Sequence, residues 1–299
     1  RRLPGALVEF RCGSAIEVAH AIREAVIRGP GAVSIAAALG LALVGRTTRS
    51  QTTYGRRAAI RGSLNAMRNA AVQTYLALRT IDRMEARFVA FGDLTEDGEG
   101  LAAALRAEAD AVVAETLAAH GRIAEHGIAA LPAAGAPPDD RPLRVLTLGS
   151  TGVLAGGQFG TALGVLSAAM SAGRALEVTV AEGRPSLDGA RLAAWELANL
   201  GIPVTVVADA AAPSRLARGE IDVVLVGAER VVANGDIVGV VGTYPVALAA
   251  ARHGVPLLVC APLAAVDLAT ADGAEVVPAE RLGHELLKIG DLRIAPDGV

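Results

Sequence analysis

The first candidate for acid–base chemistry is Glu229, a carboxylate that comes shortly after a short apolar run at residues 223–226. At the end of a buried strand a carboxyl group is partly desolvated, which raises its pKa toward the range useful for proton transfer. Glu229 is therefore a candidate general acid/base. It could instead form a structural ion pair with the neighbouring Arg230 at a sheet edge.

A glycine-rich segment, residues 149–160, follows another apolar run at 144–148 and opens an expected helix. Glycines let a ligand approach the backbone closely, and the free amides of a helix start suit an anion such as phosphate. The segment matches neither the dinucleotide-binding nor the Walker pattern, so its glycines could equally serve to pack the helix on the strand. The candidate substrate contacts in it are Gly149, Ser150, Thr151, Gly152 and Gln158.

A third polar segment follows the apolar run at residues 177–181. Arg184, fixed by the proline after it, could bind a phosphate or pair with Glu182. Glu182 could also bind a nucleotide ribose, which keeps an enzyme with a dinucleotide cofactor open as an alternative. Its spacing from the glycine-rich segment is longer than the usual separation of about 20 residues.

Residues 25–81 contain no Asp or Glu but eight arginines: Arg28, Arg46, Arg49, Arg56, Arg57, Arg61, Arg68 and Arg79. Their partners could be an anionic substrate, the acid-rich stretch 82–119 of the same chain, or another subunit. We expect pairing within the chain or between subunits to take most of them, leaving one or two for a ligand.

The first 130 residues predict an α-helical domain. Ser14 and Glu17 have capping-box spacing, which predicts a helix from there to Gly29. Further helical patterns cover residues 32–44, 66–91 and 101–131. Four prolines and a glycine within residues 131–142 predict a linker, because such a segment cannot hold a helix. The predicted domains are therefore 1–130 and 143–299.

Short β-branched runs alternate with helical patterns beyond the linker, at residues 144–148, 177–181, 204–208, 223–226 and 257–260. This alternation predicts βαβ units and a Rossmann-like, doubly wound α/β domain with a mainly parallel sheet. Ligands of such sheets bind at the carboxyl ends of the strands. The candidate residues of the second half all follow these runs.

Composition excludes several classes of protein. The 299 residues carry a net charge of −3 and only eight aromatic side chains, which argues against nucleic-acid binding. Two separated cysteines and five histidines without metal spacing predict no disulfide, metal or cofactor. The longest uncharged run, 145–173, contains seven glycines and is not expected to span a membrane. With no signal peptide at the start, we expect a cytoplasmic protein.

These segments, taken in their order along the sequence, resemble the family that contains S-methyl-5-thioribose-1-phosphate isomerase, ribose-1,5-bisphosphate isomerase and the regulatory subunits of translation initiation factor two B. The resemblance covers nearly the whole chain and rests on Ile27-Arg28-Gly29-Pro30-Gly31-Ala32, the segment 152–164, Gly183-Arg184-Pro185 with 189–197, Val226-Gly-Ala-Glu-Arg230, Asn234-Gly235 and Gly242-Thr243-Tyr244. It implies a helical domain on a Rossmann-like domain, and a homodimer through the latter.

The pocket departs from the family pattern at five positions. The family's isomerases use a cysteine and an aspartate, and by resemblance these positions hold Gly149 and Glu229. Asp188 replaces a glutamine, and the segments 239–240 (Gly-Val) and 60–61 (Ile-Arg) replace an asparagine-lysine and an arginine-proline pair. Losing a required cysteine or carboxylate costs several powers of ten in rate, so standard thioribose-phosphate isomerase activity is not expected.

The resemblance and the residues together predict a diverged aldose–ketose isomerase of a small, phosphorylated or otherwise anionic, sugar-like substrate. Glu229 would be the acid/base, and Asp188 would orient a hydroxyl or carry a second proton. Arg28, Gly29, Arg61 and Arg184, with the loop 149–152, are the candidate contacts to the substrate. The alternative is a non-catalytic ligand-binding or regulatory protein. This alternative explains the lost thiol, because a protein can keep a fold and its binding pocket after losing catalytic activity. The third hypothesis is an enzyme with a nucleotide cofactor whose ribose binds Glu182.

Overall fold

The computed structural model describes residues 3–132, 141–157, 159–277, 283–289 and 292–296. The chain forms two compact units. The helical unit comprises Arg1–His126, Thr151–Gly164 and Ala261–Ala265, and the sheet unit comprises Gly127–Ser150, Val165–Cys260 and Val266–Val299. Most of the predicted linker, residues 133–140, lies outside the described residues. The boundary at 131–142 stays a prediction.

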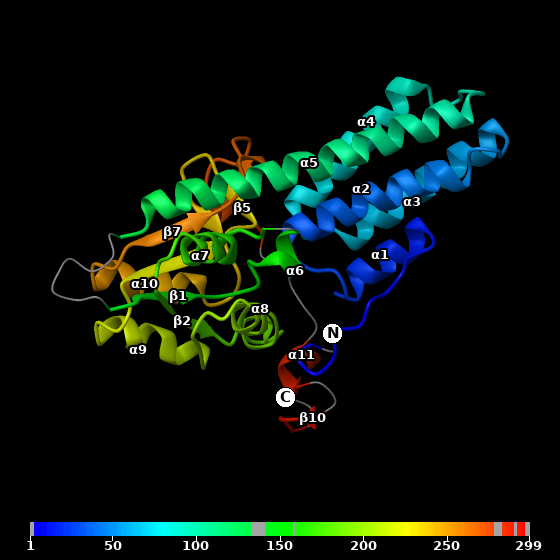
Figure 1. Cartoon of the computed structure of the whole chain (residues 1–299). Helices are drawn as coiled ribbons and strands as arrows, with labels where there is room; N and C mark the ends of the chain where they lie inside the picture. Colours follow the sequence, from blue (N-terminus) through cyan, green and yellow to red (C-terminus); the bar gives the residue numbers. More distant parts are fainter. Residues whose placement is uncertain (1–2, 133–140, 158, 278–282, 290–291, 297–299) are drawn as a thin grey trace. The chain divides into compact units, whose positions relative to one another are not determined.

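The helical unit is built around one central helix. Its elements are α1 (Ala15–Arg23), α2 (Pro30–Thr47), α3 (Thr53–Ala70), α4 (Tyr75–Phe91), α5 (Gly98–Ala130) and the one-turn α6 (Val153–Gly156). Helices α1, α3, α4 and α6 all pack against α2 (Figure 1). Among the described helices, α2 alone is long and apolar enough to cross a membrane, but 56% of it is buried in the fold, as a core helix would be.

The start of α1 follows the predicted capping pattern, but its end does not. Ser14 Oγ accepts a hydrogen bond from the amide of Glu17 at 3.2 Å, and Glu17 Oε2 accepts from the amide of Gly13 at 2.7 Å. The prediction that this helix reaches Gly29 is wrong, because α1 ends at Arg23. The chain then turns through Ala25, whose φ is +51°, before Pro30 opens α2.

The sheet unit contains the predicted parallel sheet. Its strands are β1 (Leu143–Thr147), β2 (Leu176–Ala181), β3 (Val204–Val207), β4 (Val223–Gly227) and β7 (Leu257–Cys260), and all five predicted runs are confirmed. Every pairing is parallel, in the order β3-β2-β1-β4-β7. The central strands β1, β2 and β4 are buried on both faces, which explains their continuous apolar runs.

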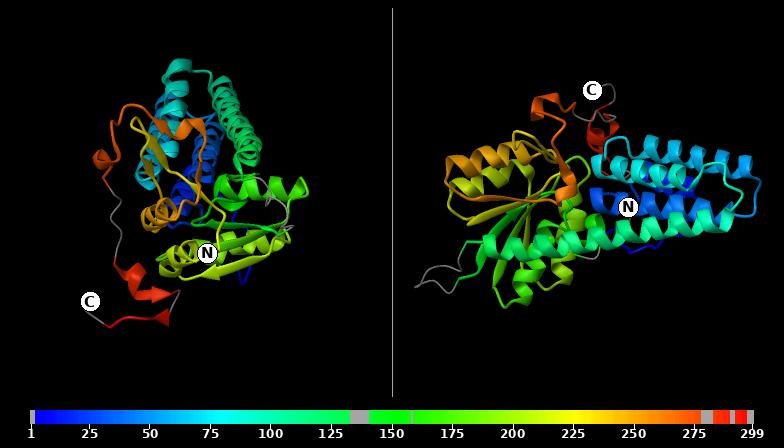
Figure 2. Two further views of the ribbon diagram at one scale, coloured as in Figure 1. Left: turned by 90° about the vertical axis from the view of Figure 1, so that its left-hand side faces the viewer. Right: turned by 90° about the horizontal axis from the view of Figure 1, so that it is seen from above.

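Helices connect these strands (Figures 1 and 2). They are α7 (Ala162–Ser171), α8 (Ala194–Asn199) after a π-helical turn at Gly189–Ala193, α9 (Ala212–Ala217) and α10 (Thr243–Arg252). A second, small sheet has the order β6-β5-β8, with β5 (Arg230–Val232), β6 (Ile237–Val238) and β8 (Val266–Asp267). Near the C-terminus lie α11 (His284–Leu287) and the hairpin β9 (Lys288–Ile289) with β10 (Leu292–Arg293). In the small sheet, β5 begins directly after Glu229.

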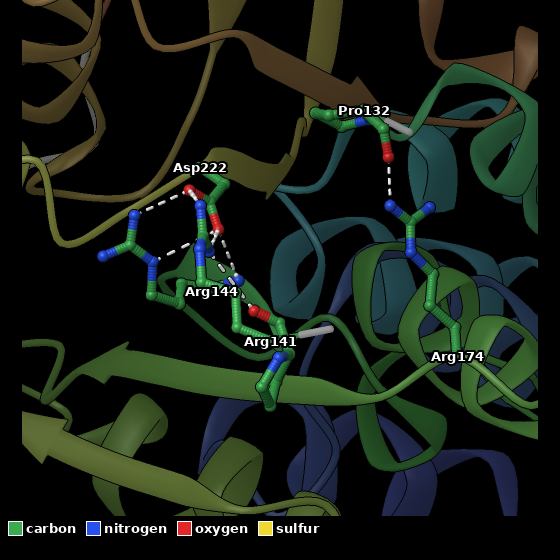
Figure 3. Close-up of polar contacts among 6 residues, drawn as sticks. Pro132, Arg141, Arg144, Arg174 and Asp222 are labelled. Carbon is green, nitrogen blue, oxygen red and sulfur yellow. Dashed lines mark hydrogen bonds and ion pairs between the residues drawn. The ribbon is translucent and has the colours of Figure 1, made fainter. Parts of the chain in front are cut away.

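An ion-pair cluster joins the amino ends of β1 and β4 (Figure 3). Asp222, just before β4, accepts hydrogen bonds from Arg141 Nη1 at 2.6 Å and from Arg144 Nη2 at 2.7 Å. The Arg144 amide donates to the same carboxylate at 2.9 Å, and the Asp222 amide donates to the Arg144 carbonyl at 2.8 Å. Nearby, Arg174 donates to the carbonyl of Pro132 (Figure 3). The cluster fixes the register in which Val145 lies opposite Val223.

We expect Asp222→Asn to lower the free energy of unfolding by about 2 kcal/mol at pH 7, because it removes charge-assisted hydrogen bonds from a mostly buried carboxylate. Burial alone would raise the pKa of Asp222, but the hydrogen bonds from Arg141 and Arg144 hold it well below its ordinary value. The stabilisation is therefore present above the unfolded pKa of about 4 and lost as the pH falls below it.

Urea unfolding from pH 7 to pH 3 measures this difference. The matched control is Asp110→Asn, which breaks the exposed pair between Arg106 and Asp110 and should change stability little. Equal stability of wild type and Asp222→Asn at pH 7 would contradict the assigned role of the cluster.

Candidate active site

The order of the sheet reverses between β1 and β4, since β2 and β3 lie on one side of this pair and β7 on the other. Ligands of doubly wound folds bind at this switch point, outside the carboxyl ends of the strands. Gly149 comes two residues after β1, and Glu229 comes two residues after β4. The structure therefore brings these two predicted positions to the same edge of the sheet.

Gly149 is packed against a turn at residues 239–242. A Cβ atom added to Gly149 would lie 3.1 Å from Val240 Cγ2, and the φ of Gly149 is +78°. A Cβ atom added to Gly239 would lie 2.7 Å from Thr243 Oγ1. The Thr243 hydroxyl donates a hydrogen bond to the Val240 carbonyl at 2.7 Å. A cysteine at 149 or an asparagine at 239 would thus displace its neighbour. The residues present at 149, 239, 240 and 243 therefore fit closely together.

Glu229 is half-buried and its backbone is held in place. Its amide donates to the Val238 carbonyl at 2.8 Å, which ties it to β6. The next side chain, Arg230, donates from Nη1 to Asp267 Oδ2 at 3.3 Å. The structure thus gives Arg230 a carboxylate partner on β8, and the role of Glu229 as acid/base stays a prediction.

The loop after β2 is fixed by a residue that the sequence did not single out. The Asp209 carboxylate accepts hydrogen bonds from the amides of Gly183 at 2.8 Å and Arg184 at 2.7 Å. Asp209 comes two residues after β3. Its place directly after an apolar run was the sequence signal that could have marked it as a candidate. This contact holds the backbone of Arg184 just beyond the carboxyl end of β2, in the loop that continues to Asp188.

The Arg184 side chain is directed at the carbonyl of Leu286, to which Nη2 donates at 3.0 Å. Its Nη1 is buried and has no hydrogen-bond partner among the described residues. The structure shows no ion pair between Arg184 and Glu182 in the described part of the chain, although the sequence left that pairing open. Asp188 directly precedes the π-helical turn, and Gly189 is closely packed on the Ala181 carbonyl.

In the helical unit, Arg28 and Gly29 stand at the start of α2. Gly29 has a φ of +87° and would overlap Ala155 if it carried a Cβ atom. A Cβ atom on Gly31 would lie 2.9 Å from the Gly156 carbonyl oxygen. The turn that begins at Gly152 thus packs directly on the start of α2. The glycine-rich segment serves helix packing here, which leaves its anion-binding role a prediction.

The hydroxyl oxygens of Ser150 and Thr151 are buried and have no hydrogen-bond partner among the described residues. A buried hydroxyl without a partner costs about 1–3 kcal/mol, so a polar ligand atom or a water that binds it gains that amount. Both residues remain candidate substrate contacts for this reason. Gln158 lies outside the described residues.

Several arginines of residues 25–81, the segment without Asp or Glu, bind partners within the helical unit. Acids of residues 82–99 form ion pairs with Arg49, Arg57, Arg61 and Arg68. Arg56 is buried and donates to the carbonyls of Arg49, Gln51 and Thr95. The expected pairing within the chain is confirmed for these residues. Arg61 also lies 5.9 Å from the centre of the Phe88 ring, and its contact to a ligand stays a prediction.

His120 of α5 is 2% exposed and packs against Gly156 of α6, where a Cβ atom would lie 2.9 Å from the ring's Cε1. Its Nδ1 is buried and has no partner in the described part of the chain. Burial lowers the pKa of His120, because a charged imidazole would lose its hydration. Among the described residues, no group of three or more His, Cys, Asp or Glu could hold a metal ion.

Comparison with known proteins decides the family. Residues 26–299 match the Initiation factor 2 subunit family. The chain belongs to this family. The family resemblance predicted from the ordered motifs is thereby confirmed.

Relatives of this chain include two proteins named methylthioribose-1-phosphate isomerase. The protein of Chloroflexus aurantiacus is 40% identical over 303 residues, covering 100% of this chain and 83% of its own length. That of Alkalilimnicola ehrlichii is 41% identical over 299 residues, covering 100% and 82%.

Two solved structures share the fold. The 5-methylthioribose 1-phosphate isomerase from Pyrococcus horikoshii has a TM-score of 0.86 at 30% identity, covering 99% of this chain and 80% of that one. The delta subunit of translation initiation factor eIF-2B from A. fulgidus has a TM-score of 0.82 at 30% identity, covering 100% and 84%. The fold is therefore common to an isomerase and to a translation-factor subunit.

We expect the stability of the protein to fall as the pH drops below about 6.5, because the unfolded chain binds a proton at His120 before the folded chain can. The slope for one proton is at most about 1.4 kcal/mol per pH unit. His120→Asn should remove this part of the pH dependence between pH 6.5 and 5, as measured by urea unfolding. His253→Asn, at an exposed position, is the control and should keep the slope. An unchanged slope in His120→Asn would contradict the assignment.

Proposed function

We propose that the chain is a sugar-phosphate isomerase with a diverged active site and that Glu229 is its acid/base. The single observation that carries the proposal is the placement of Glu229, half-buried after β4, at the reversal of strand order where β1 delivers Gly149. The isomerase relatives, 40–41% identical over the whole chain, support the kind of reaction. The cysteine position holds Gly149, so the proposed chemistry uses carboxyl groups alone.

Conversion of a cyclic aldose 1-phosphate to a 2-ketose needs no external oxidant. One hydrogen moves from carbon 2 to carbon 1, the 2-hydroxyl loses a proton, and the ring oxygen gains one as its bond to carbon 1 opens. Glu229 would take one of these protons and return it, and Asp188 is the proposed second proton carrier or the group that orients a hydroxyl.

The anionic end of the substrate is proposed to bind Arg28 and the loop 149–152. Two observations support this assignment. Arg28 and Gly29 stand at the start of α2, whose N-cap has no side-chain hydrogen bond. The buried hydroxyls of Ser150 and Thr151 have no protein partner among the described residues. A phosphorylated or otherwise anionic sugar supplies acceptor oxygens to both kinds of group.

A non-catalytic ligand-binding protein is the second candidate, and one observation favours it. The contact between Gly149 and Val240 fills the space in which a cysteine side chain would begin. In either case we propose a cytoplasmic homodimer that binds a small anionic substrate, without metal, cofactor, nucleic acid or membrane.

Glu229→Gln is expected to lower turnover of a pentose 1-phosphate by roughly 10²- to 10⁴-fold while leaving the Kd nearly unchanged, because the amide keeps the shape but cannot carry the proton. Steady-state kinetics and calorimetric titration measure the two effects. Glu182→Gln, at the end of the neighbouring strand β2, is the matched control and should leave turnover intact. Turnover that survives in Glu229→Gln would refute the assignment, and stabilisation by a dinucleotide alone would favour the Glu182 alternative.

A further inference from the structure

Arg184, in the loop after β2, uses only part of its capacity for hydrogen bonds. Its Nη2 donates to the Leu286 carbonyl at 3.0 Å. Its Nη1 is buried and has no hydrogen-bond partner among the described residues. A buried guanidinium nitrogen without an acceptor is unfavourable, because it has lost its hydration without a replacement. One side of the guanidinium is therefore satisfied, and the other is open to an acceptor from outside the described chain.

The position of Arg184 is fixed at both its backbone and its side chain. Asp209 Oδ1 accepts from the Gly183 amide at 2.8 Å, and Asp209 Oδ2 accepts from the Arg184 amide at 2.7 Å. These bonds anchor the loop to the residues that follow β3, and the Leu286 carbonyl sets the direction of the side chain. A donor that is already held in place loses less conformational entropy when a ligand binds it.

The Leu286 carbonyl belongs to a C-terminal strap, by which we mean residues 283–289 and 292–296. Within the strap, α11 packs on β9, and β9 pairs with β10. Leu286 and Leu292 are 57% and 68% exposed, so their side chains bury little apolar surface against the rest of the fold. A segment with few buried apolar contacts opens at a low cost in free energy. The bond from Arg184 is therefore a sizeable part of what holds the strap.

The open side of the Arg184 guanidinium favours an anionic acceptor. In the described part of the chain its side chain meets a neutral carbonyl and no carboxylate. A guanidinium is a forked donor that suits phosphate and carboxylate oxygens, and its bonds to charged acceptors are about twice as strong as those between neutral groups. An oxygen of a phosphate group therefore fits Nη1 better than a sugar hydroxyl does.

We propose that Arg184 Nη1 binds an anionic oxygen of the ligand and that the strap is the element that holds the guanidinium for it, through the Leu286 carbonyl. The inference rests on the proposed function, in which the ligand is a phosphorylated or otherwise anionic sugar. Because Nη1 is buried, the ligand reaches it when part of the chain moves, and the weakly held strap contacts the same guanidinium. Strap and ligand bind one guanidinium in one orientation, so each strengthens the binding of the other.

Site-specific proteolysis of the full chain tests the proposal. Lys288, in β9 of the strap, is exposed and is the only lysine of the sequence, so endoproteinase Lys-C cuts at one position. The rate of this cut in the folded protein measures how often the strap opens. Inorganic phosphate and ribose 1-phosphate are the probes. At saturating concentration, at least one of them is expected to slow the cut of the wild-type chain roughly threefold or more.

Arg184→Met is expected to speed the cut roughly 3- to 10-fold, the effect of losing one hydrogen bond to a charged group, and to abolish the effect of the probes. The matched control is Arg218→Met. Arg218 lies between α9 and β4 and forms an exposed pair with Glu220. Its replacement should leave both the cutting rate and the response to the probes unchanged, which also separates the proposal from an effect of phosphate on the protease.

An unchanged rate in a folded Arg184→Met protein overturns the proposal, and so do probes that leave the wild-type rate unchanged or raise it. If Arg184→Met does not fold, Asp209→Asn, which loosens the Arg184 backbone, decides in its place, and an unchanged rate there overturns the proposal. The digestion needs no turnover. A chain that responds as expected but converts no sugar phosphate refutes the proposed function alone, and a chain that is active but shows no response refutes the role of the strap alone.

Discussion

The pairing of β1 with β4 is the constraint on which the candidate site depends. The chain builds the sheet outward from this pair in two directions, so the pair marks the only reversal in strand order of the described five-stranded sheet. Asp222 joins the amino ends of the two strands through Arg141 and Arg144. Because both strands are parallel and in fixed register, their carboxyl ends deliver Gly149 and Glu229 to the same edge.

The segments around Gly149 and Gly239 pack closely on one another. Gly149 leaves room for Val240, and Gly239 leaves room for Thr243, which binds the Val240 carbonyl. Close packing makes such changes interdependent, since adding a single side chain would displace its neighbour. Under the proposed function, this packing belongs to a pocket shaped for its own ligand.

Much of the fold could be predicted because its signals are local. Each strand is a β-branched run between turn signals, and the Ser14 cap depends on residues three positions apart. The end of α1 was missed because apolar residues continue the helical pattern past Arg23, while Pro30 opens a separate helix. Asp209 and His120 act on segments distant in the sequence, Gly183 and Gly156. The place of Asp209 after an apolar run could mark it as a candidate, but its partners, like those of His120, became visible only in the structure.

The central claim is that this chain rearranges a sugar phosphate with carboxyl groups and without a cysteine. Phosphorus-31 NMR of the purified protein incubated with methylthioribose 1-phosphate, ribose 1-phosphate and related aldose 1-phosphates tests it most directly. The account predicts that at least one aldose 1-phosphate is converted to a ketose 1-phosphate, with new resonances that are absent when Glu229→Gln is used. A panel in which every aldose 1-phosphate persists unchanged, although one of them binds, would contradict the account and establish a binding protein instead.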